Sequence, residues 1–417
     1  MAAESGLIRK RLMDIVALGL PLFAVLLISL GINVVIVLTR PLHLSHTTRA
    51  HDTTAVQSAH KSPTPRIGGL GVLVAAMVGI VLFYPSDARF PMAVFAVSVL
   101  PVFLVGLAED LGWDMSPARR LVAAAGSSTV MALGAGVWIG SSGLPGLDTL
   151  LMMAPFAIVF TILWSTGLCH AFNLIDGVNG LSATTGILIA VGLSVIALLS
   201  GQTGMAILAL SLVPALLGFL ALNWPLGKVF LGDAGAYSVG HLLAWVGILV
   251  AAASPDVAGV AVALLFFWPV ADTLFAIYRR YRAGRRADQP DRLHFHQLVM
   301  RGLEIQVLGR DRRGMANSLT TVVLAPAIAA PVFVGVLTWD KPYAALISAV
   351  VFAVLFVAAY VAGITYVRER ARGCGSNGRS KIRSVSSDFA PEREAEATAA
   401  AVSTARPSRS PTVIDSV

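Results

Sequence analysis

Charged residues are scarce in this sequence. Asp, Glu, Lys and Arg make up 13% of the 417 residues, whereas soluble domains carry about 25%. Hydrophobic residues account for 56% of the chain, and the mean hydropathy is +0.77. So few charges could not cover the water-facing surface of a chain of this length, which excludes a string of soluble domains and indicates that the lipid bilayer is the solvent.

Two further features are missing, and cysteine is rare. The alternation of apolar and polar residues that marks a transmembrane β-barrel is absent, so the bundle is expected to be helical. No repeat of about 20–50 residues is seen. There are only two cysteines, Cys169 and Cys374. Both fall on the side predicted below to be the reducing one, so neither is expected in a structural disulfide.

Long apolar runs are what the chain does contain. A helix needs about 20 apolar residues to cross the hydrocarbon. The first run is too long for a signal-peptide core and has no clear cleavage site, so it is kept as a span. We therefore predict an all-α, polytopic bundle of about 10–11 transmembrane helices. The eleven candidate spans are 15–38, 67–84, 91–108, 121–140, 150–168, 181–199, 205–223, 234–253, 257–278, 318–338 and 343–366.

The distribution of Lys and Arg predicts the orientation. With the N-terminus outside, the inside segments hold 26 Lys and Arg residues and the outside segments hold 5. Only the cluster of Arg9, Lys10 and Arg11 opposes this orientation. The net charge of +8 follows from this bias and from the tail. It suits anionic lipid headgroups and requires no nucleic-acid partner.

Two regions are expected along the chain. Residues 1–370 form the transmembrane region with its inside loops. Residues 371–417 are rich in Arg, Ser, Ala and Glu, contain proline and show no apolar periodicity. This composition is typical of a disordered segment, here placed inside.

Five inside segments carry most of the polar chemistry. The first, HKSPTPRIGG at 60–69, offers Lys61 and Arg66 to a phosphate, with two glycines that permit close approach. An interfacial anchor for lipid headgroups explains the two cations equally well. The second ends an apolar helix with Glu109 and Asp110, which are suited to binding a cation or accepting a proton. Solvation at the interface is the alternative reading of these two acids.

The third segment, HAFNLIDGVNG at 170–180, places Asn173, Asp176 and Asn179 at every third residue. On a helix or tight turn these side chains would share one side. Asn179 as a helix cap is the simpler explanation. However, the loop has no Lys or Arg, so the positive-inside bias does not account for it. We therefore favour a ligand-binding role.

In the fourth segment, Asp233 lies between glycines just before an apolar span. It is interpreted either as a helix cap or as a hard oxygen ligand for Mg²⁺. In the fifth, DRLHFHQ at 291–297, no further ligands suited to zinc accompany His294 and His296. Contacts to phosphate or sugar, shared with Arg292, fit better, although such a pair in a loop is often only solvated.

Two polar residues fall inside predicted spans. Asp272 has Phe275 and Ala276 at i+3 and i+4, so it has no local ion pair and is expected to face the bundle or a polar cavity. His241 is expected to make an interhelical hydrogen bond.

In this order and on one side of the membrane, the five segments resemble the polyprenyl-phosphate N-acetylhexosamine-1-phosphate transferase family. The resemblance covers residues 15–366 and rests on the ordered set, since no single motif is decisive. It implies a Mg²⁺-dependent reaction, with Mn²⁺ as a substitute. A polyprenyl phosphate, undecaprenyl phosphate in bacteria, attacks the β-phosphorus of a UDP-activated amino sugar and releases UMP. It also implies the bacterial inner membrane, with the active site facing the cytoplasm and the product initiating a cell-envelope polysaccharide.

The resemblance assigns roles to residues. Asp233 matches the main Mg²⁺ carboxylate and Asn173 a second metal ligand. Glu109 and Asp110 match an acidic pair that positions or deprotonates the lipid phosphate. Asp176 and Asn179 match the loop that touches the nucleotide, where Asp176 is expected to be catalytic and Asn179 to bind substrate. The positions associated with phosphate and sugar binding are Lys61, Arg66, Arg292, His294 and His296.

The sequence departs from the commonest family pattern at three positions: Glu109 replaces Asp, Asn179 stands where Asp is frequent, and Gln297 replaces the last His. The third change affects the expected specificity more than the expected activity. The PTPR stretch at 63–66 and the eleventh span resemble the GlcNAc branch more than the pentapeptide translocase.

Two other classes remain open at this point. A transporter or flippase would use Asp272, His241 and the inside acids as a path, but it should show polar residues at mid-membrane and inverted repeats. An inactive scaffold of a polysaccharide assembly would use the tail for binding. The sugar, the downstream polymer and a homodimer are left open.

Overall fold

The computed structural model describes residues 2–47, 64–84, 92–284 and 293–373. All regular elements in these ranges are helices, so the all-α prediction is confirmed. The chain divides into two compact units, Met1–Tyr360 and Val361–Val417. The site described below lies within the first unit. The predicted tail falls outside the described residues from 374 onward, while residues 371–373 complete the last helix.

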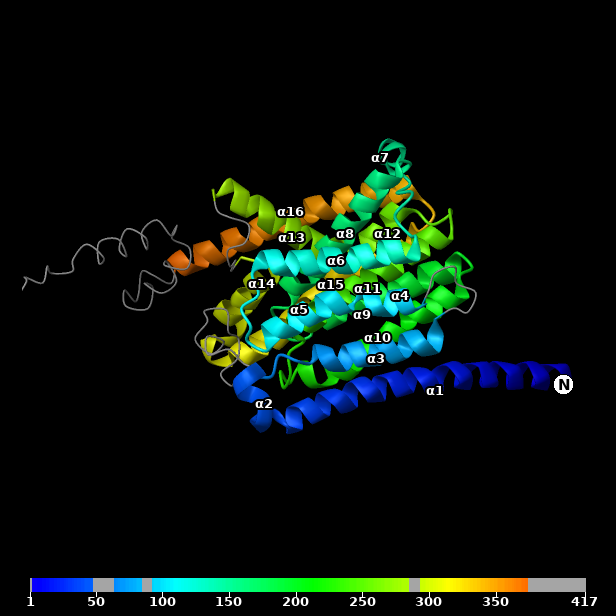
Figure 1. Ribbon diagram of the computed structural model, residues 1–417. Helices are drawn as coiled ribbons and strands as arrows, with labels where there is room; N and C mark the ends of the chain where they lie inside the picture. The colour runs from blue at the N-terminus through cyan, green and yellow to red at the C-terminus, as the bar shows by residue number, and fades with distance from the viewer. Residues whose placement is uncertain (1, 48–63, 85–91, 285–292, 374–417) are drawn as a thin grey trace, which may run out of the picture. The chain divides into compact units, whose positions relative to one another are not determined.

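The described chain contains sixteen α-helices, one short π-helix (η1) and one short 3₁₀-helix (η2) (Figure 1). In order they are α1 (Ala2–Leu38), α2 (Arg40–Thr47), α3 (Gly69–Phe83), α4 (Met92–Ser98), α5 (Leu100–Asp110), α6 (Pro117–Ala135), α7 (Pro145–Leu151), α8 (Ala154–Ile175), α9 (Leu181–Leu199), α10 (Thr203–Asn223), α11 (Gly232–Ala253), α12 (Gly259–Leu265), α13 (Phe267–Arg282), α14 (Phe295–Leu303), η1 (Glu304–Leu308), η2 (Arg310–Arg312), α15 (Arg313–Leu337) and α16 (Pro342–Gly373).

Every predicted span coincides with a helix or a helix pair. In the described residues, eight spans are long and apolar enough to cross a membrane. A ninth is formed by α12 and α13, which are bent by 79° at Phe266. The other two predicted spans correspond to α3, which has only 15 residues, and to α6, which falls short of the same test. The chain is therefore a polytopic helical membrane protein.

The boundaries predicted for the span at 121–140 are wrong at both ends. Helix α6 begins at Pro117, because the Ser116 hydroxyl accepts a hydrogen bond from Arg119 N at 3.3 Å and caps the first turn. It ends at Ala135, because Gly136 adopts a left-handed conformation with φ of 64°. Arg119 and Arg120 therefore belong to a helix and not to a loop.

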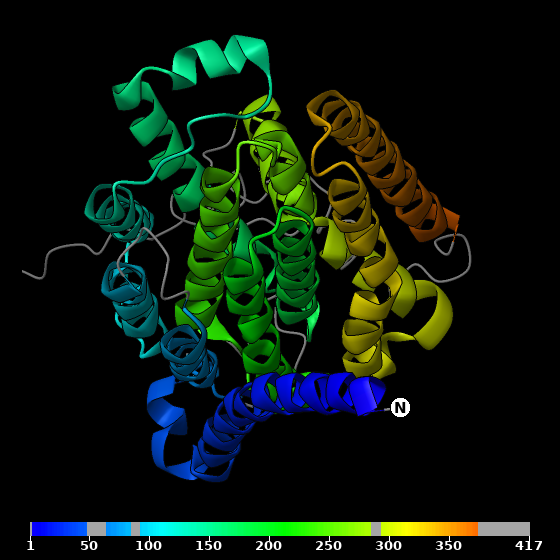
Figure 2. The same cartoon turned by 90° about the vertical axis from the view of Figure 1, so that its right-hand side faces the viewer.

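Helix α11 forms the centre of the bundle. In its most apolar stretch 83% of the residues are buried, against 22% in α1. It packs against α8, α5, α3 and α9. Figure 2 shows α9, α10 and α11 in the middle, with α1 along one side and α3 to α6 along another. Outer helices such as α1 and α15 expose large apolar side chains, as expected for surfaces that meet lipid.

Glycines allow α3, α5 and α11 to meet where α11 begins. A Cβ on Gly69 would overlap the backbone of Gly235, and one on Gly106 would lie 2.6 Å from Ala234 Cα. Such close approach through small residues is typical of membrane helix packing. It brings the end of α5 and the start of α3 against the first turn of α11.

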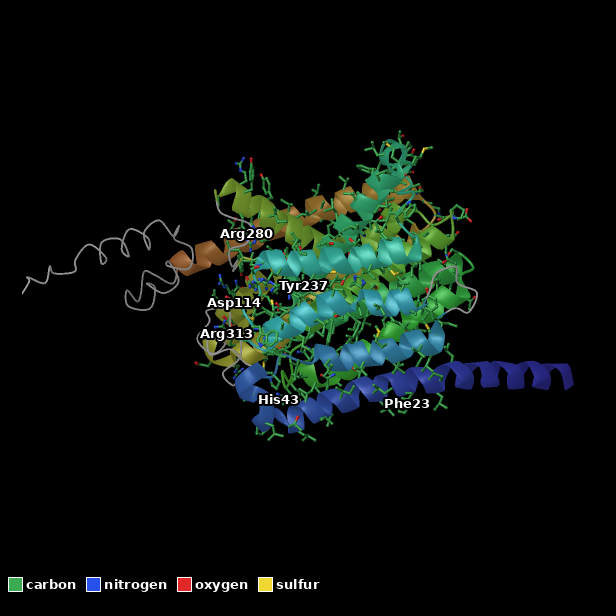
Figure 3. The ribbon with its side chains drawn as sticks, viewed as in Figure 1. Phe23, His43, Asp114, Tyr237, Arg280 and Arg313 are labelled. Atoms are coloured by element: carbon green, nitrogen blue, oxygen red, sulfur yellow. The ribbon has the colours of Figure 1, made fainter. Side chains whose placement is uncertain are left out.

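The polar segments gather at one end of the bundle. The chain ends α5 and α8 there and begins α3, α6, α9 and α11, so the described parts of the five motif regions lie around one cluster of contacts. Figure 3 labels Asp114, Tyr237, Arg280 and Arg313 toward this end. At the opposite end, the carboxylate of Asp148 accepts hydrogen bonds from Ser142 N and Oγ at 2.6 and 2.7 Å. The helices therefore alternate between the two ends as the predicted topology requires.

Candidate active site

The carboxylate of Asp233 is the centre of the polar cluster. It lies in the first turn of α11, and its side chain is only 10% exposed. Oδ1 accepts hydrogen bonds from Asn173 Nδ2 at 3.1 Å and from a guanidinium nitrogen of Arg66 at 3.5 Å. Oδ2 accepts one from Arg120 at 3.3 Å. Residues from α6, α8, α11 and the segment before α3 thus converge on one carboxylate.

Asp110 holds the start of α11 in place. Its two carboxylate oxygens accept hydrogen bonds from Asp233 N and Ala234 N, both at 2.9 Å, and its side chain is fully buried. The first N–H groups of a helix have no partner within the helix, and a negative charge there is favourable. Asp110 therefore fixes the backbone that carries Asp233. Its predicted role toward a lipid phosphate stays a prediction.

Glu109 makes different contacts from its neighbour. Oε2 accepts a hydrogen bond from Met115 N at 2.7 Å, and Oε1 lies 3.7 Å from a guanidinium nitrogen of Arg120. Because Arg120 also reaches Asp233, it bridges two acids from separate helices. The predicted acidic pair thus contacts the site at two places, Asp110 at the backbone of Asp233 and Glu109 at the guanidinium group of Arg120.

The loop between α8 and α9 has a geometry that the three-residue spacing did not predict. Helix α8 ends at Ile175, so Asn173, Asp176 and Asn179 do not share one helical face. Asn173 faces Asp233. Asn179 is held to α15 through its backbone, with its N–H bound to Asn317 Oδ1 at 2.7 Å and its carbonyl accepting from Thr321 at 2.6 Å. The alternative reading of Asn179 as the cap of α9 is wrong, because Gly180 occupies that position.

The carboxyl group of Asp176 is a weaker acid than that of an ordinary aspartate. Burial raises the pKa of its carboxyl to about 7, with Arg66 opposing this shift and Asp233 adding to it. A group with a pKa near the working pH can gain or release a proton during turnover. This is consistent with the catalytic role predicted for Asp176, which stays a prediction.

The histidine segment is buried rather than solvated. His294 caps α14 and is 3% exposed, and His296 is 1% exposed. Their rings stack with centroids 5.7 Å apart. His296 lies against Gly177, where an added Cβ would overlap its Nε2. The segment therefore reaches the loop that carries Asp176. Lys61 and Arg292, predicted to join this site, lie outside the described residues.

The two intramembrane residues each have a partner on another element. Asp272 binds His294 Nδ1 at 2.9 Å. His241 binds Ser98 Oγ at 2.9 Å, which confirms the predicted interhelical hydrogen bond.

Sequence reasoning missed Arg120 as a site residue. None of the five motifs contains it, although Ser116-Pro117 is a helix-start signal that places Arg120 one turn into a helix. His170 and Tyr237 were also given no role in the site. Their rings meet edge to face at 5.1 Å, and His170 Nε2 is buried with no hydrogen-bond partner among the described residues.

The cluster is suited to anionic ligands. Two partly exposed guanidinium groups, Arg66 and Arg120, stand beside buried carboxylates, and arginine binds phosphate through paired hydrogen bonds. In the described ranges no three His, Cys, Asp or Glu side chains are arranged to hold a metal ion by themselves. The donors present are nevertheless hard oxygens, from Asp233 and Asn173. Mg²⁺ commonly uses one or two protein ligands together with substrate phosphates and water, so this set fits Mg²⁺.

The contact between Gly177 and His296 gives a testable prediction. Gly177→Ala should push His296 away from the loop and lower kcat/KM about tenfold, through a higher KM for the UDP-sugar that the resemblance predicts as donor. Steady-state kinetics on purified protein measures this. Gly167→Ala on α8 is the control, because nothing lies within 4 Å of its added methyl. Equal kinetics for both variants would show that the contact has no part in binding.

Comparison with known proteins identifies a matching family model and several similar proteins. The model for glycosyl transferase family 4 matches residues 92–251. A protein of Bacillus subtilis (strain 168) named probable undecaprenyl-phosphate N-acetylglucosaminyl 1-phosphate transferase is 27% identical over 282 residues, covering 67% of this chain and 78% of that protein. A decaprenyl-phosphate N-acetylglucosaminephosphotransferase of Mycobacterium leprae (strain TN) is 28% identical over 280 residues, covering 58% and 68%. An undecaprenyl-phosphate alpha-N-acetylglucosaminyl 1-phosphate transferase of Escherichia coli O157:H7 is 27% identical over 309 residues, covering 72% of this chain and 79% of that protein.

The fold and the site define a multi-pass helical membrane protein with a cluster of acids and arginines at one end of its bundle. The matched region contains Glu109, Asp110, Asn173, Asp176 and Asp233. Residues 92–251 match the model of glycosyl transferase family 4, which confirms the resemblance to the polyprenyl-phosphate N-acetylhexosamine-1-phosphate transferases.

Proposed function

We propose that this protein transfers N-acetylhexosamine-1-phosphate, such as GlcNAc-1-phosphate, from a UDP-sugar to undecaprenyl phosphate and releases UMP. The observation that carries the proposal is the position of Asp233 between Arg66 and Arg120 at the start of the central helix, in a chain that matches the family 4 model. The relatives named above are transferases of N-acetylglucosamine 1-phosphate to polyprenyl phosphates.

The geometry suits phosphoryl transfer. This reaction needs little covalent help from a protein and depends on holding two anions in line while the developing charge is neutralised. Arg66 and Arg120 would bind the donor diphosphate and would exchange their contacts with Asp233 for contacts with phosphate. Asp233 and Asn173 would hold Mg²⁺, which would supply positive charge to the reacting phosphates when bound. Asp110 keeps Asp233 fixed throughout.

A lipid acceptor suits the surroundings of the site. The polar cluster lies at the end of an apolar bundle, where a membrane-anchored phosphate and a soluble nucleotide can meet. An apolar cavity of about 440 Å³, lined by residues that include Trp164, Ala251 and Phe266, lies toward the other end of α8 and α11. Its apolar walls would accommodate part of a hydrocarbon chain.

The excess of Lys and Arg on the predicted inside loops supports a site that faces the cytoplasm, and the bacterial relatives support a location in the bacterial inner membrane. UDP-sugars would reach the site from that side. A transport path is less well supported, because Asp272 and His241 are both bonded to neighbouring side chains.

The proposal is tested by its lipid product. Purified protein incubated with undecaprenyl phosphate, Mg²⁺ and UDP-GlcNAc should form a lipid in which the sugar is attached through a diphosphate, identified by mass spectrometry. A sugar attached through a single phosphate would contradict the proposed bond cleavage.

Removing residues 375–417 should leave catalysis intact. This segment carries none of the five motifs, and it lies outside the described residues. The truncated protein should therefore keep its turnover within about twofold of the full chain, measured on equal amounts of monodisperse protein. A well-folded truncated protein without activity would show that the tail contributes to the site or to substrate binding.

A further inference from the structure

The turn formed by residues 293–295, which leads into α14, is held by contacts from two other helices. The carbonyl of Leu293 accepts a hydrogen bond from the Tyr360 hydroxyl at 2.9 Å. The ring of Phe295 packs edge to face on Trp268, with centroids 5.2 Å apart. Between these two, His294 is fixed by Asp272. Every residue of the turn is therefore anchored on α13 or α16.

Asp272 contributes both of its oxygens to this anchoring. Oδ2 lies 2.9 Å from His294 Nδ1, and Oδ1 accepts a hydrogen bond from Phe295 N at 3.0 Å. Asp272 is 2% exposed and His294 3% exposed, so water does not compete for these contacts. An ionised carboxylate only accepts hydrogen bonds, which requires that His294 carries a proton on Nδ1. In the neutral imidazole, Nε2 is then left as an acceptor.

The anchored turn is connected to the candidate active site. The His294 ring stacks on the His296 ring, and His296 lies against Gly177, next to Asp176. A change in the orientation of His294 would therefore be passed to His296 and to the loop that carries Asp176. Asp272 itself lies on α13 and is not among the residues that contact Asp233.

We propose that Asp272 is a positioning residue that fixes the tautomer and the orientation of His294, and through it the histidine segment that contacts the substrate. The claim of substrate contact rests on the proposed function, whereas the pairing of the two side chains does not. A purely structural role would require only an acceptor for Phe295 N. The bond to His294 Nδ1 requires a second acceptor on the same side chain, which a carboxylate has and an amide lacks.

Asp272→Asn separates these two roles. The amide oxygen can still accept from Phe295 N, but the amide nitrogen then faces His294 Nδ1 and donates to it. The imidazole must respond by moving its proton to Nε2 or by turning away. The size of the side chain is unchanged, so the packing around α13 and α14 is expected to persist.

Kinetics provide the first test. Asp272→Asn and His294→Gln should each lower kcat/KM by about tenfold to a hundredfold, mainly through the KM for the UDP-sugar. The double variant should be no worse than His294→Gln, because both changes remove the same arrangement. Additive losses would refute the proposal. Ser98→Ala is the control: it removes an equally buried bond to a histidine, His241, and should change thermal stability without this shift in KM.

The tautomer provides a test that does not depend on turnover. In protein labelled with ¹⁵N-histidine, His294→Gln identifies the signals of His294. The wild-type spectrum should show Nδ1 protonated, and Asp272→Asn should reverse this. An unprotonated Nδ1 in the wild-type protein would overturn the proposal even if the variant failed to fold. Should folded wild-type protein show no transferase activity, the proposed function would fail while the spectrum still decides the pairing.

Discussion

Replacing Asp233 with asparagine is expected to lower turnover by about a thousandfold or more. The carboxylate receives Arg66, Arg120 and Asn173, and it is the proposed protein ligand for Mg²⁺. An amide has the same shape but no negative charge. It would hold the cation weakly and would remove one anionic partner from each arginine, while Arg66 keeps Asp110 and Arg120 keeps Glu109 nearby. The rate of UMP formation under saturating donor and lipid measures the effect.

Folding of this variant should be preserved. Asp110 binds the backbone N–H of residue 233 and not its side chain, so the start of α11 stays capped. Asp256→Asn is the matched control, because this acid is exposed and follows the far end of α11. It should keep full activity. Near-normal turnover of a monodisperse Asp233→Asn protein would rule out Asp233 as the essential carboxylate.

Removing divalent cations should abolish turnover, with a decrease of at least about a hundredfold. Donor diphosphate and lipid phosphate repel each other, and the two arginines are partly offset by Glu109, Asp110 and Asp233. Additional positive charge is therefore needed to bring both anions together. Treatment with EDTA followed by an activity assay tests this expectation.

The controls for cation removal use the same protein sample. Adding Mg²⁺ in excess over the chelator should restore activity, and Mn²⁺ should substitute for it. EDTA already saturated with Mg²⁺ should have no effect. Full activity after exhaustive chelation would refute the metal requirement and leave the arginines as the source of positive charge.

The apolar runs were sufficient to predict the helices of the transmembrane bundle. Each of the eleven predicted spans contains a helix or a broken pair, because a run of apolar residues long enough to cross the bilayer has few other stable conformations there. Boundaries were less predictable. The start of α6 depends on the Ser116 cap, and α14 is too short and too polar to stand out from a basic loop.

Asn173 and Asp233, which the resemblance assigns to one metal site, are hydrogen-bonded to each other, although their roles as metal ligands stay predictions. The capping of α11 by Asp110 could not have been predicted, because the two partners are 123 residues apart and only the packing of α5 on α11 joins them. The same holds for Asp272 and His294. The order of the motifs identified the candidate residues. Only the tertiary contacts show that Asp110 holds the backbone of Asp233 and that Asp272 holds His294.

The most direct test of the account is the identity of the nucleotide that the purified protein releases. The assay combines undecaprenyl phosphate, Mg²⁺ and a panel of UDP-N-acetyl sugars, and separates UMP from UDP by chromatography. The account predicts UMP, formed only when both lipid and metal are present, with the best donor naming the sugar. Release of UDP would mean ordinary glycosyl transfer and would contradict the proposed attack on the β-phosphorus.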